Sequence, residues 1–536
     1  MKRYYVLFII IIYIFLFSSC KKSFLDENQT NTYATSNTYS DSLGFEAGLA
    51  GLQAIVRTQY TYAGDQGLIG MWYLGTDEAI ALATQSTGVM TDYYNYSSLN
   101  SSDGGASYYW NWAYSVITNA NLIIHASEDS SVKFVSAANK KYLNAEARFY
   151  RAYAYNFLAT LWGPVPLITD PIASARTNFT RTSLDSVNNQ IITDLNFGIG
   201  TLYSPDSVAI LKKQGRPNTD MARQLLAEVY LRTGNNTMAQ TMCQAVINSK
   251  HYSLISNRYG IRSNSYGDAF SDMFIKGNER RSEGNTEAIW VIEQDITITG
   301  GSTGSDQHRR MWVPGYYNIG GMLLCDSLGG RGVGRIKLSQ WAIYGLYDSY
   351  DIRNSVYSIH RQLYYNDPSS SLYGQAVKLT GNDTITKSCA YTTKWNYYNS
   401  TDVYGYGTYK DLIMMRLGET YLLLAEAQFK QGDLAGAASS INVLRKRAYK
   451  DYPTHGQISS SDITLDFILD ERARELLAEE NRRMTLVRTG TLLERVTNHA
   501  DAGYVIGLKS YNSLLPLPQS EINLNKDAVL TQNLGY

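Results

Sequence analysis

The chain has 536 residues, and its 48 basic and 48 acidic side chains balance, so its charge does not predict binding to nucleic acid or to an anionic membrane. A chain of this length has ample surface to bury and suggests two or more structural units. The chain has 44 tyrosines against 14 phenylalanines, an excess that favours surfaces on which aromatic rings stack on a binding partner while remaining in contact with water. Many of these tyrosines must nevertheless be packing residues.

Residues 1–19 are built like a secretory signal. Two basic residues precede an apolar run from Val6 to Phe17, which is too short to span a bilayer comfortably. Two serines then lead directly to Cys20, an arrangement that resembles the lipobox of a bacterial lipoprotein, although Phe17 stands where leucine is usual. The resemblance implies that the signal is removed and that Cys20 carries the lipids. An ordinary signal peptide and an uncleaved anchor helix stay as alternatives.

Residues 20–42 follow as a predicted tether, because Asn, Thr and Ser dominate them and such a composition cannot bury a core. A helical apolar period then runs from Ser42 to Ala63, and another from Trp110 to His125. The tyrosine-rich and glycine-rich stretch between them, from Thr84 to Ser107, is predicted to be a loop. The N-terminal part of the folded chain is thus predicted to consist of helices joined by a polar loop.

The helix beginning at Asn144 is the most conspicuous pattern in the chain. Alanines recur every seven residues along it, while Phe and Tyr fill the spaces between them. A helix that is apolar almost all round is buried on several sides, so its aromatic residues are predicted to be core. Gly163 is placed to end it in a left-handed cap, and Pro164 and Pro166 forbid its continuation.

Two later segments, from Ala222 to Ile247 and from Arg416 to Tyr449, have the offsets of tetratricopeptide units. Such units cannot bury their faces alone, so they must stack on neighbours. They are separated by residues 251–410, which hold much Gly, Tyr and Asn and short β-like runs such as that from Glu287 to Thr299. This insertion is predicted to be an irregular, loop-rich region carried on the helical scaffold.

The segment from Asp466 to Val496 is predicted to be a strongly charged helical pair. Glu471 and Glu475 alternate there with several arginines, and ion pairs that hold a helix to its neighbours explain them better than catalysis does. The proline-braced end of the chain is predicted to dock back onto the body. The predicted units are 1–19, 20–42, an N-terminal helical region 43–250, the irregular region 251–410, and C-terminal helices with their docked strap, 411–536.

A series of motifs runs along nearly the whole chain: Cys20, FLDE at Phe24–Glu27, TDEA at Thr76–Ala79, the EARFYRAYAY…LWGPVPL block, the Asp351–Arg353 pair, RLGETYLLLAEA at Arg416–Ala427, INVLRKRA at Ile441–Ala448, ERARELLAEENRR at Glu471–Arg483 and QNLGY at Gln532–Tyr536. The combination is specific because of its order and spacing. Taken together, these residues resemble the SusD/RagB family of outer-membrane glycan-binding lipoproteins from the Bacteroidetes.

The resemblance implies a mainly α fold, a right-handed superhelix of tetratricopeptide-like helix pairs with a loop-rich region that contains small β elements. It also implies a lipid-anchored, non-enzymatic protein on the extracellular side of the outer membrane, with no cofactor. Such a protein captures oligosaccharide and passes it to a SusC-like TonB-dependent transporter.

Signals for catalysis are poor. The six histidines have no paired ligand spacing, so no metal site is predicted. The stretch from Gly300 to Gly304 formally matches the GxSxG nucleophile elbow, but the residues after it do not begin the helix that this motif requires. No catalytic residue is predicted. A lipid-anchored glycoside hydrolase and a scaffold that binds only protein stay as alternatives.

Sugar binding needs an aromatic ring to stack on the pyranose and polar groups to meet its hydroxyls. Two loops offer such sets, and in the family the aromatic platform commonly comes from loops in about these regions, without a fixed motif. The predicted ligand-binding residues are Tyr93, Tyr94 and Tyr96 in the first loop, and Trp312, Tyr316 and Tyr317 in the second.

Overall fold

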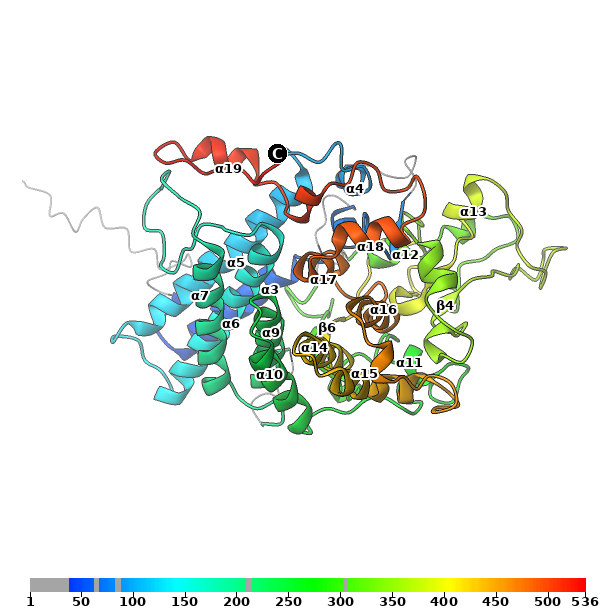
Figure 1. Ribbon diagram of the computed structural model, residues 1–536, viewed down its shortest axis with the longest axis horizontal. Helices are drawn as coiled ribbons and strands as arrows, with labels where there is room; N and C mark the ends of the chain where they lie inside the picture. The colour runs from blue at the N-terminus through cyan, green and yellow to red at the C-terminus, as the bar shows by residue number, and fades with distance from the viewer. Residues whose placement is uncertain (1–37, 62–66, 82–87, 208–214, 303–305) are drawn as a thin grey trace, which may run out of the picture.

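The computed structural model describes residues 38–61, 67–81, 88–207, 215–302 and 306–536 (Figure 1). The predicted signal, Cys20 and most of the tether lie outside these ranges. Within them, no helix combines the length and the apolar character needed to cross a lipid bilayer. The fold is helical with a few short strands, as the sequence predicts.

Helix α6 (Ala137–Leu161) lies at the centre of the N-terminal helices. Most of its side chains are buried, since it packs against α3 (Ser42–Arg57), α5 (Gly104–Glu128) and α7 (Leu184–Thr201). Its Phe and Tyr side chains are buried in the core, except Tyr153, which is partly buried and packs against the core; this confirms the prediction for the helix. Gly163 follows its end with φ of +73°, the left-handed conformation expected there.

The two helix pairs predicted from repeat offsets are present. The first consists of α9 (Thr219–Arg232) and α10 (Asn236–Asn248), and the second of α14 (Leu417–Lys430) and α15 (Leu434–Ala448). Helix α10 packs directly on α14, although the whole irregular region separates them in sequence (Figure 1). The long insertion therefore leaves the helical stack and returns to it without opening a gap between the two pairs.

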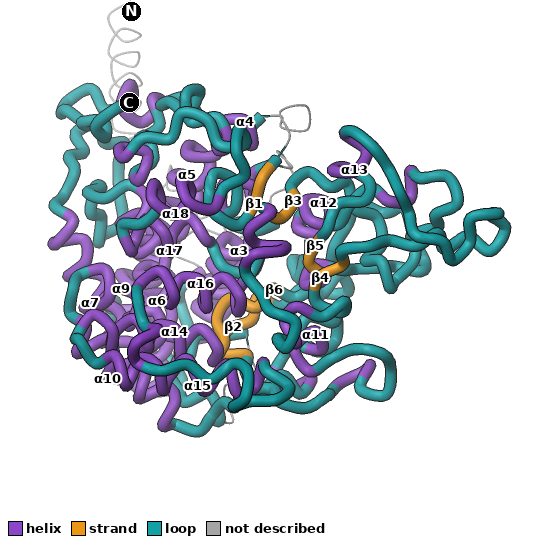
Figure 2. Tube along the Cα trace, turned by 45° about the vertical axis from the view of Figure 1, so that its right-hand side comes forward, coloured by secondary structure: helices purple, strands orange, loops and turns teal. Residues whose placement is uncertain are grey.

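The irregular region contributes at least one strand to each of the short antiparallel pairs that the structure describes, and Figure 2 shows these pairs between the helices and the loops. The strand pairs are β1 (Ala79–Ile80) with β3 (Lys337–Leu338), β2 (Ala288–Ile292) with β6 (Leu412–Arg416), and β4 (Ile359–His360) with β5 (Tyr391–Thr392). Its short α-helices are α11 (Ala269–Asp272), α12 (His308–Trp312) and α13 (Asn382–Thr386). The predicted β-like run thus forms β2, which joins the insertion to the segment just before α14.

Two sequence predictions differ from the structure in detail. The predicted N-terminal loop contains a short helix, α4 (Val89–Tyr94). The predicted charged pair is three helices: α16 (Leu465–Leu476), α17 (Arg482–Thr489) and α18 (Leu492–His499). Residues with positive φ, Ala478 and Gly490, interrupt the helical period between them, and this conformation breaks a helix whatever the side-chain pattern.

The end of the chain packs back onto α6. The Leu515 backbone N–H donates to the Leu161 carbonyl (2.7 Å), and the Trp162 indole donates to the Pro516 carbonyl (2.9 Å). The short helix α19 (Gln519–Leu524) follows. One continuous apolar core reaches from Phe45 in α3 to Leu530 in this segment.

The charged residues of α16 form a buried network with distant segments. Glu475 meets Arg416 just before α14 (2.5 Å) and Arg353 in the irregular region (2.9 Å). Glu471 meets the same Arg353 (2.8 Å). The role predicted for these carboxylates, holding a helix to its neighbours, is confirmed, but their partners come from across the chain as well as from the helix itself.

A second network connects the N-terminal TDEA motif to the C-terminal helices. Asp77 accepts hydrogen bonds from Arg482 (2.7 Å) and Arg495 (2.9 Å), and all three side chains are fully buried. Burial alone would raise the pKa of Asp77, but these two guanidinium groups lower it to about 2. Because charged groups are rarely buried without partners, this network ties the two ends of the chain together.

Candidate ligand-binding site

Four of the six aromatic residues predicted to bind ligand are buried. Tyr93, Tyr96, Trp312 and Tyr316 each expose no more than 1% of their surface. The Tyr93 hydroxyl donates to the Asp103 carboxylate (2.8 Å), and the Trp312 ring lies edge-on to Tyr73 (5.1 Å between centroids). In this conformation these four side chains pack the interior, and the prediction that they stack on a ligand is corrected accordingly.

Tyr94 and Tyr317 are half-buried. Tyr94 ends α4, where its carbonyl accepts a hydrogen bond from Ile506 (2.9 Å). Tyr317 lies just after α12, in a short helical turn (Tyr316–Asn318). In the described part of the chain, no ring contact or hydrogen bond joins the two residues. Ligand contact stays a prediction for both.

Tyr317 belongs to a group of arginine and tyrosine side chains, which we call the Arg/Tyr cluster: Arg310, Arg331, Arg335, Tyr317 and Tyr406. Burial disfavours the charge of Arg331, but Tyr317 and Tyr406 act on it and raise its pKa. The guanidinium carbons of Arg310 and Arg331 lie 4.7 and 4.4 Å from the centroid of the Tyr406 ring, within cation–π range. Tyr406 is 59% exposed, so the cluster presents an aromatic residue at the surface beside two cationic groups.

The positive charges of the cluster act on one another. Burial, followed by the charges of Arg335 and Arg331, lowers the pKa of Arg310 to about 10. Arg310 therefore stays protonated at neutral pH, although its environment disfavours the charge.

Arg309, the neighbour of Arg310 in α12, fixes the loop that carries Tyr406. Its guanidinium donates to the carbonyls of Tyr397 (3.0 Å) and Gly405 (2.9 Å). Arg331 in turn donates to the carbonyl of Tyr404, whose ring is 65% exposed. The tyrosine-bearing loop is thus held against α12 by charge-assisted bonds rather than by regular secondary structure.

The residues from Asp402 to Lys410, DVYGYGTYK, were not among those predicted to bind ligand. Their alternation of tyrosine and glycine was a usable signal, since it matches the composition of the two loops that were chosen. The contact of this loop with α12, by contrast, could not be predicted from the neighbouring residues in the sequence.

A separate hollow of about 460 Å³ lies in the irregular region beside α11 and β4. Its lining combines tyrosine rings with polar groups: Tyr266, Tyr357, Tyr398, His360, Asn396 and Lys276. Burial lowers the pKa of His360, which favours the neutral imidazole. The hollow is large enough for part of a small polar ligand, but none of the predicted residues lines it.

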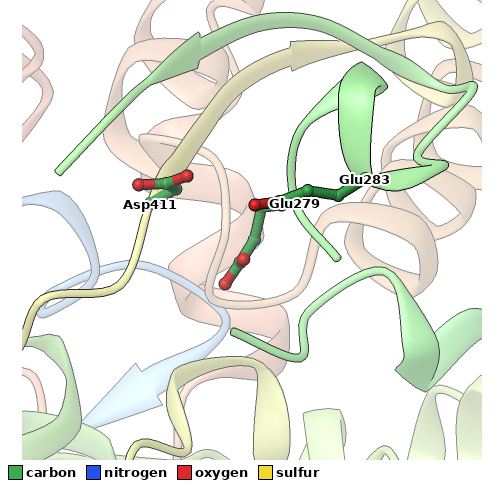
Figure 3. A group of neighbouring side chains, drawn as sticks. All are labelled: Glu279, Glu283 and Asp411. Carbon is green, nitrogen blue, oxygen red and sulfur yellow. The ribbon is translucent and has the colours of Figure 1, made fainter. Parts of the chain in front are cut away.

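Three carboxylates gather next to β6, and Figure 3 shows Asp411 at the start of that strand near Glu279 and Glu283. Their oxygens lie within 4.8 Å of one another. Arg280 forms ion pairs with Asp411 and Glu283, while burial, opposed by the nearby Lys410, raises the pKa of Glu279 to about 8. Arg280 and Lys410 thus supply positive charge to these carboxylates, and an ion-pair network within the chain accounts for the cluster.

The serine of the formal GxSxG match has a structural partner. The Ser302 hydroxyl donates to the side-chain carbonyl of Gln294 (2.9 Å). An amide oxygen cannot take up the proton of a nucleophile as a general base does, so this bond offers no activation. Residues Thr303 and Gly304 of the match lie outside the described ranges.

Sequence comparison matches two related families to the two parts of the chain. A family model described as "SusD family" matches residues 286–536. Another, described as "Starch-binding associating with outer membrane", matches residues 23–231. The matches therefore fall on the N-terminal helical half and on the C-terminal half with most of the irregular region.

Individual proteins resemble the chain over nearly its whole length. SusD-like protein P25 of Formosa agariphila is 24% identical over 96% of both chains. A solved laminarin-binding SusD-like protein shares the fold with a TM-score of 0.70 and 23% identity, over 93% of this chain and 100% of that one. Surface glycan-binding protein A of Bacteroides thetaiotaomicron, solved with laminarihexaose, gives a TM-score of 0.68 and 19% identity, over 92% and 99%.

Proposed function

The chain belongs to the SusD family, and from this premise we propose that it is a glycan-binding lipoprotein of the cell surface, anchored in the outer membrane through Cys20. In this proposal it captures oligosaccharide and delivers it to a SusC-like TonB-dependent transporter, without cleaving it. The observation that carries the proposal is the pair of family matches, at residues 23–231 and 286–536. The names of two relatives, which refer to laminarin and glycan binding, and the description of the second family model, which refers to starch binding, support the ligand class.

We place the ligand at the Arg/Tyr cluster, with Tyr317 and Tyr406 as stacking rings and Tyr94 as a second contact. The exposed ring of Tyr406 supports this placement, because a pyranose needs an accessible aromatic face and nearby hydrogen-bond donors. The arginines beside it supply several donors in a fixed geometry.

Binding is tested by affinity electrophoresis in gels that contain one polysaccharide each, neutral or acidic, followed by calorimetry on the best ligand. Tyr317→Ala and Tyr406→Ala should each weaken binding about tenfold, which corresponds to losing one stacking contact of about 1.4 kcal/mol. Tyr344→Ala is the matched control, because Tyr344 is 65% exposed and belongs to another part of the irregular region. Unchanged affinity in both cluster variants would move the site elsewhere, and the hollow near His360 would be tested next.

The anchor and the partner need separate tests. A Cys20→Ser variant should leave the membrane fraction, and protease treatment of intact cells should digest the wild-type protein if it faces outward. Copurification of a TonB-dependent transporter would support delivery. A scaffold that binds only protein would copurify the transporter and retain no glycan, whereas a hydrolase would release reducing sugar from the bound polysaccharide.

A further inference from the structure

Arg310 is exceptional among the buried arginines that the structure describes. Only 8% of its surface is exposed, yet its side chain forms no ion pair and no hydrogen bond with any described residue. Its Nε atom is buried and unpaired. A buried cation without a compensating group is costly, so such a group calls for an explanation.

Other buried arginines show what compensation normally looks like in this chain. Arg353 and Arg416 each meet two or more carboxylates, and Arg483 donates to the backbone carbonyls of Met71 and Leu74. Even Arg309, next to Arg310 in sequence, meets the carbonyls of Tyr397 and Gly405. The chain therefore neutralises or hydrogen-bonds its buried guanidinium groups, and it does neither at Arg310.

The charges that face Arg310 make its position less favourable. They come from Arg331 and Arg335, and the other groups acting on it are the hydroxyls of Tyr317 and Tyr406. In the described part of the chain, Arg331 forms no ion pair either. Several like charges next to one another repel, and an anion bound between them would relieve that repulsion.

The geometry favours an anion that is attached to a sugar. Tyr406, whose ring both guanidinium groups approach, is 59% exposed as a residue and can stack on a pyranose. A carboxylate or sulfate on that sugar would then lie within reach of Arg310 and Arg331. Arginine is the side chain best suited to such groups, because its planar fork donates two parallel hydrogen bonds to two oxygens.

We propose that the glycan bound by this chain is acidic, carrying uronic-acid carboxylates or sulfate esters, and that Arg310 and Arg331 hold one such group beside the rings of Tyr317 and Tyr406. This inference rests on the proposed glycan-binding function and narrows its ligand to an anionic class. Laminarin, which the solved relative named above binds, is a neutral glucan, so the inference separates this chain from that relative.

The first experiment compares retention of the wild-type protein in gels with polygalacturonate, dextran sulfate, laminarin or starch. We expect retention by at least one of the two acidic polymers and little or none by the neutral ones. Polygalacturonate carries carboxylates and dextran sulfate carries sulfate esters, so the two gels distinguish the sources of charge. Retention by a neutral polymer alone would overturn the acidic-ligand inference and leave glycan binding intact, while retention in no gel would count against both.

The second experiment removes the charges singly. Arg331→Gln and Arg310→Gln should each lower affinity for the acidic ligand about tenfold, the loss expected for one charge-assisted contact. Arg331→Lys should keep part of the affinity, since a lysine preserves the charge but not the two-point contact. Because Arg310 is largely buried, the thermal midpoint of its variant is measured beside binding, and the more accessible Arg331 carries the test if Arg310→Gln does not fold.

Arg176→Gln is the matched control. Arg176 is exposed and its guanidinium lies 4.7 Å from the Phe179 ring, so the variant removes the same charge from a similar cation–π pair outside the cluster. Equal losses in the control and the cluster variants would show nonspecific attraction of a polyanion and would overturn the proposal. A loss of affinity that is confined to the cluster variants, and that persists at about 0.15 M salt, the physiological ionic strength, would support the proposal.

Discussion

At the scale of single residues, Arg353 shows how this chain keeps charge in its interior. Its guanidinium bonds the carboxylates of Asp351 (2.7 Å), Glu471 (2.8 Å) and Glu475 (2.9 Å), and none of the four side chains is exposed. Such a group is stable because every charge has a partner at hydrogen-bond distance. Removing one member leaves the others buried and uncompensated.

We therefore predict that Arg353→Met lowers the free energy of unfolding by about 3–5 kcal/mol. The measurement is urea denaturation followed by circular dichroism. Lys387→Met is the control, because Lys387 forms a single ion pair with Asp383 (3.0 Å) in which both side chains are partly exposed. That pair should contribute less than about 1 kcal/mol. Equal effects of the two substitutions would contradict the prediction.

The same carboxylates predict acid sensitivity. Burial would raise the pKa of Glu471, but Arg353, Arg474 and Arg445 lower it to about 2, and Arg488 and Lys430 do the same for Glu426. As the pH falls, a carboxyl group whose pKa is lower in the folded state becomes protonated first in the unfolded chain. Its stabilisation is therefore complete above about pH 4.5 and is lost as the pH falls toward 2.

We expect the urea midpoint to fall steeply between pH 4.5 and pH 2.5. Complete protonation of each of these carboxylates should lower the free energy of unfolding by about 3 kcal/mol. Glu426→Gln should make this slope shallower, because it removes one of the titrating groups. The pKa of Glu279 is instead raised to about 8, so its contribution to stability is complete below about pH 4.5 and is lost as the pH rises toward 8, outside the acid range tested here. A midpoint that is constant from pH 5 to pH 2.5 would contradict the assignment.

At the scale of elements, α6 shows how a helix is ended by one residue. Gly163 has φ of +73°, and a Cβ atom added there would lie 3.3 Å from a Leu514 methyl group in the docked C-terminal segment. Glycine thus satisfies two conditions, the left-handed backbone and the close approach of the strap. An alanine would meet both a strained φ and a tight contact.

Gly163→Ala should lower the free energy of unfolding by about 1–2 kcal/mol, the usual penalty of the left-handed conformation. Gly51→Ala is the opposite case, because Gly51 lies in α3 with ordinary φ and nothing within 4 Å of the added Cβ. That substitution should stabilise the protein by about 0.5–1 kcal/mol, since alanine loses less backbone freedom in a helix. Thermal midpoints of the two variants should move in opposite directions.

At the scale of the whole molecule, the two ends of the chain are held together by apolar burial and by charge. The C-terminal segment covers α6, and Asp77 near the N-terminus meets Arg482 and Arg495 near the C-terminus. Both connections span several hundred residues of sequence. They connect segments that precede the irregular region in sequence with segments that follow it.

Leu515→Ala should lower the free energy of unfolding by about 2–5 kcal/mol, because Leu515 is 1% exposed and its removal leaves a cavity against α6. Leu534→Ala, in the same segment, should change it by less than about 0.5 kcal/mol, because Leu534 is 89% exposed. Denaturant midpoints of the pair test whether the strap contributes to global stability. Equal, small effects would mean that the strap opens independently of the body.

The sequence alone determined the helical class of the fold, the helix pairs and the end of α6, and its motifs indicated the family. These features depend on local rules: apolar periodicity places a helix, and Gly163, Gly234 and Gly432 supply the positive φ at its end. A local rule can be read from neighbouring residues without knowing the rest of the chain. The predicted unit boundaries and the lipid anchor stay predictions.

Only the tertiary structure decided which aromatic rings face outward and which charges meet. Tyr316 and Tyr317 are adjacent in sequence, yet the first is fully buried and the second is only half-buried. Tyr406 comes to lie beside Arg310 and Arg331, and Arg353 reaches Glu471, across long stretches of chain. Exposure and long-range pairing depend on what the distant chain covers, and no window of local sequence contains that information.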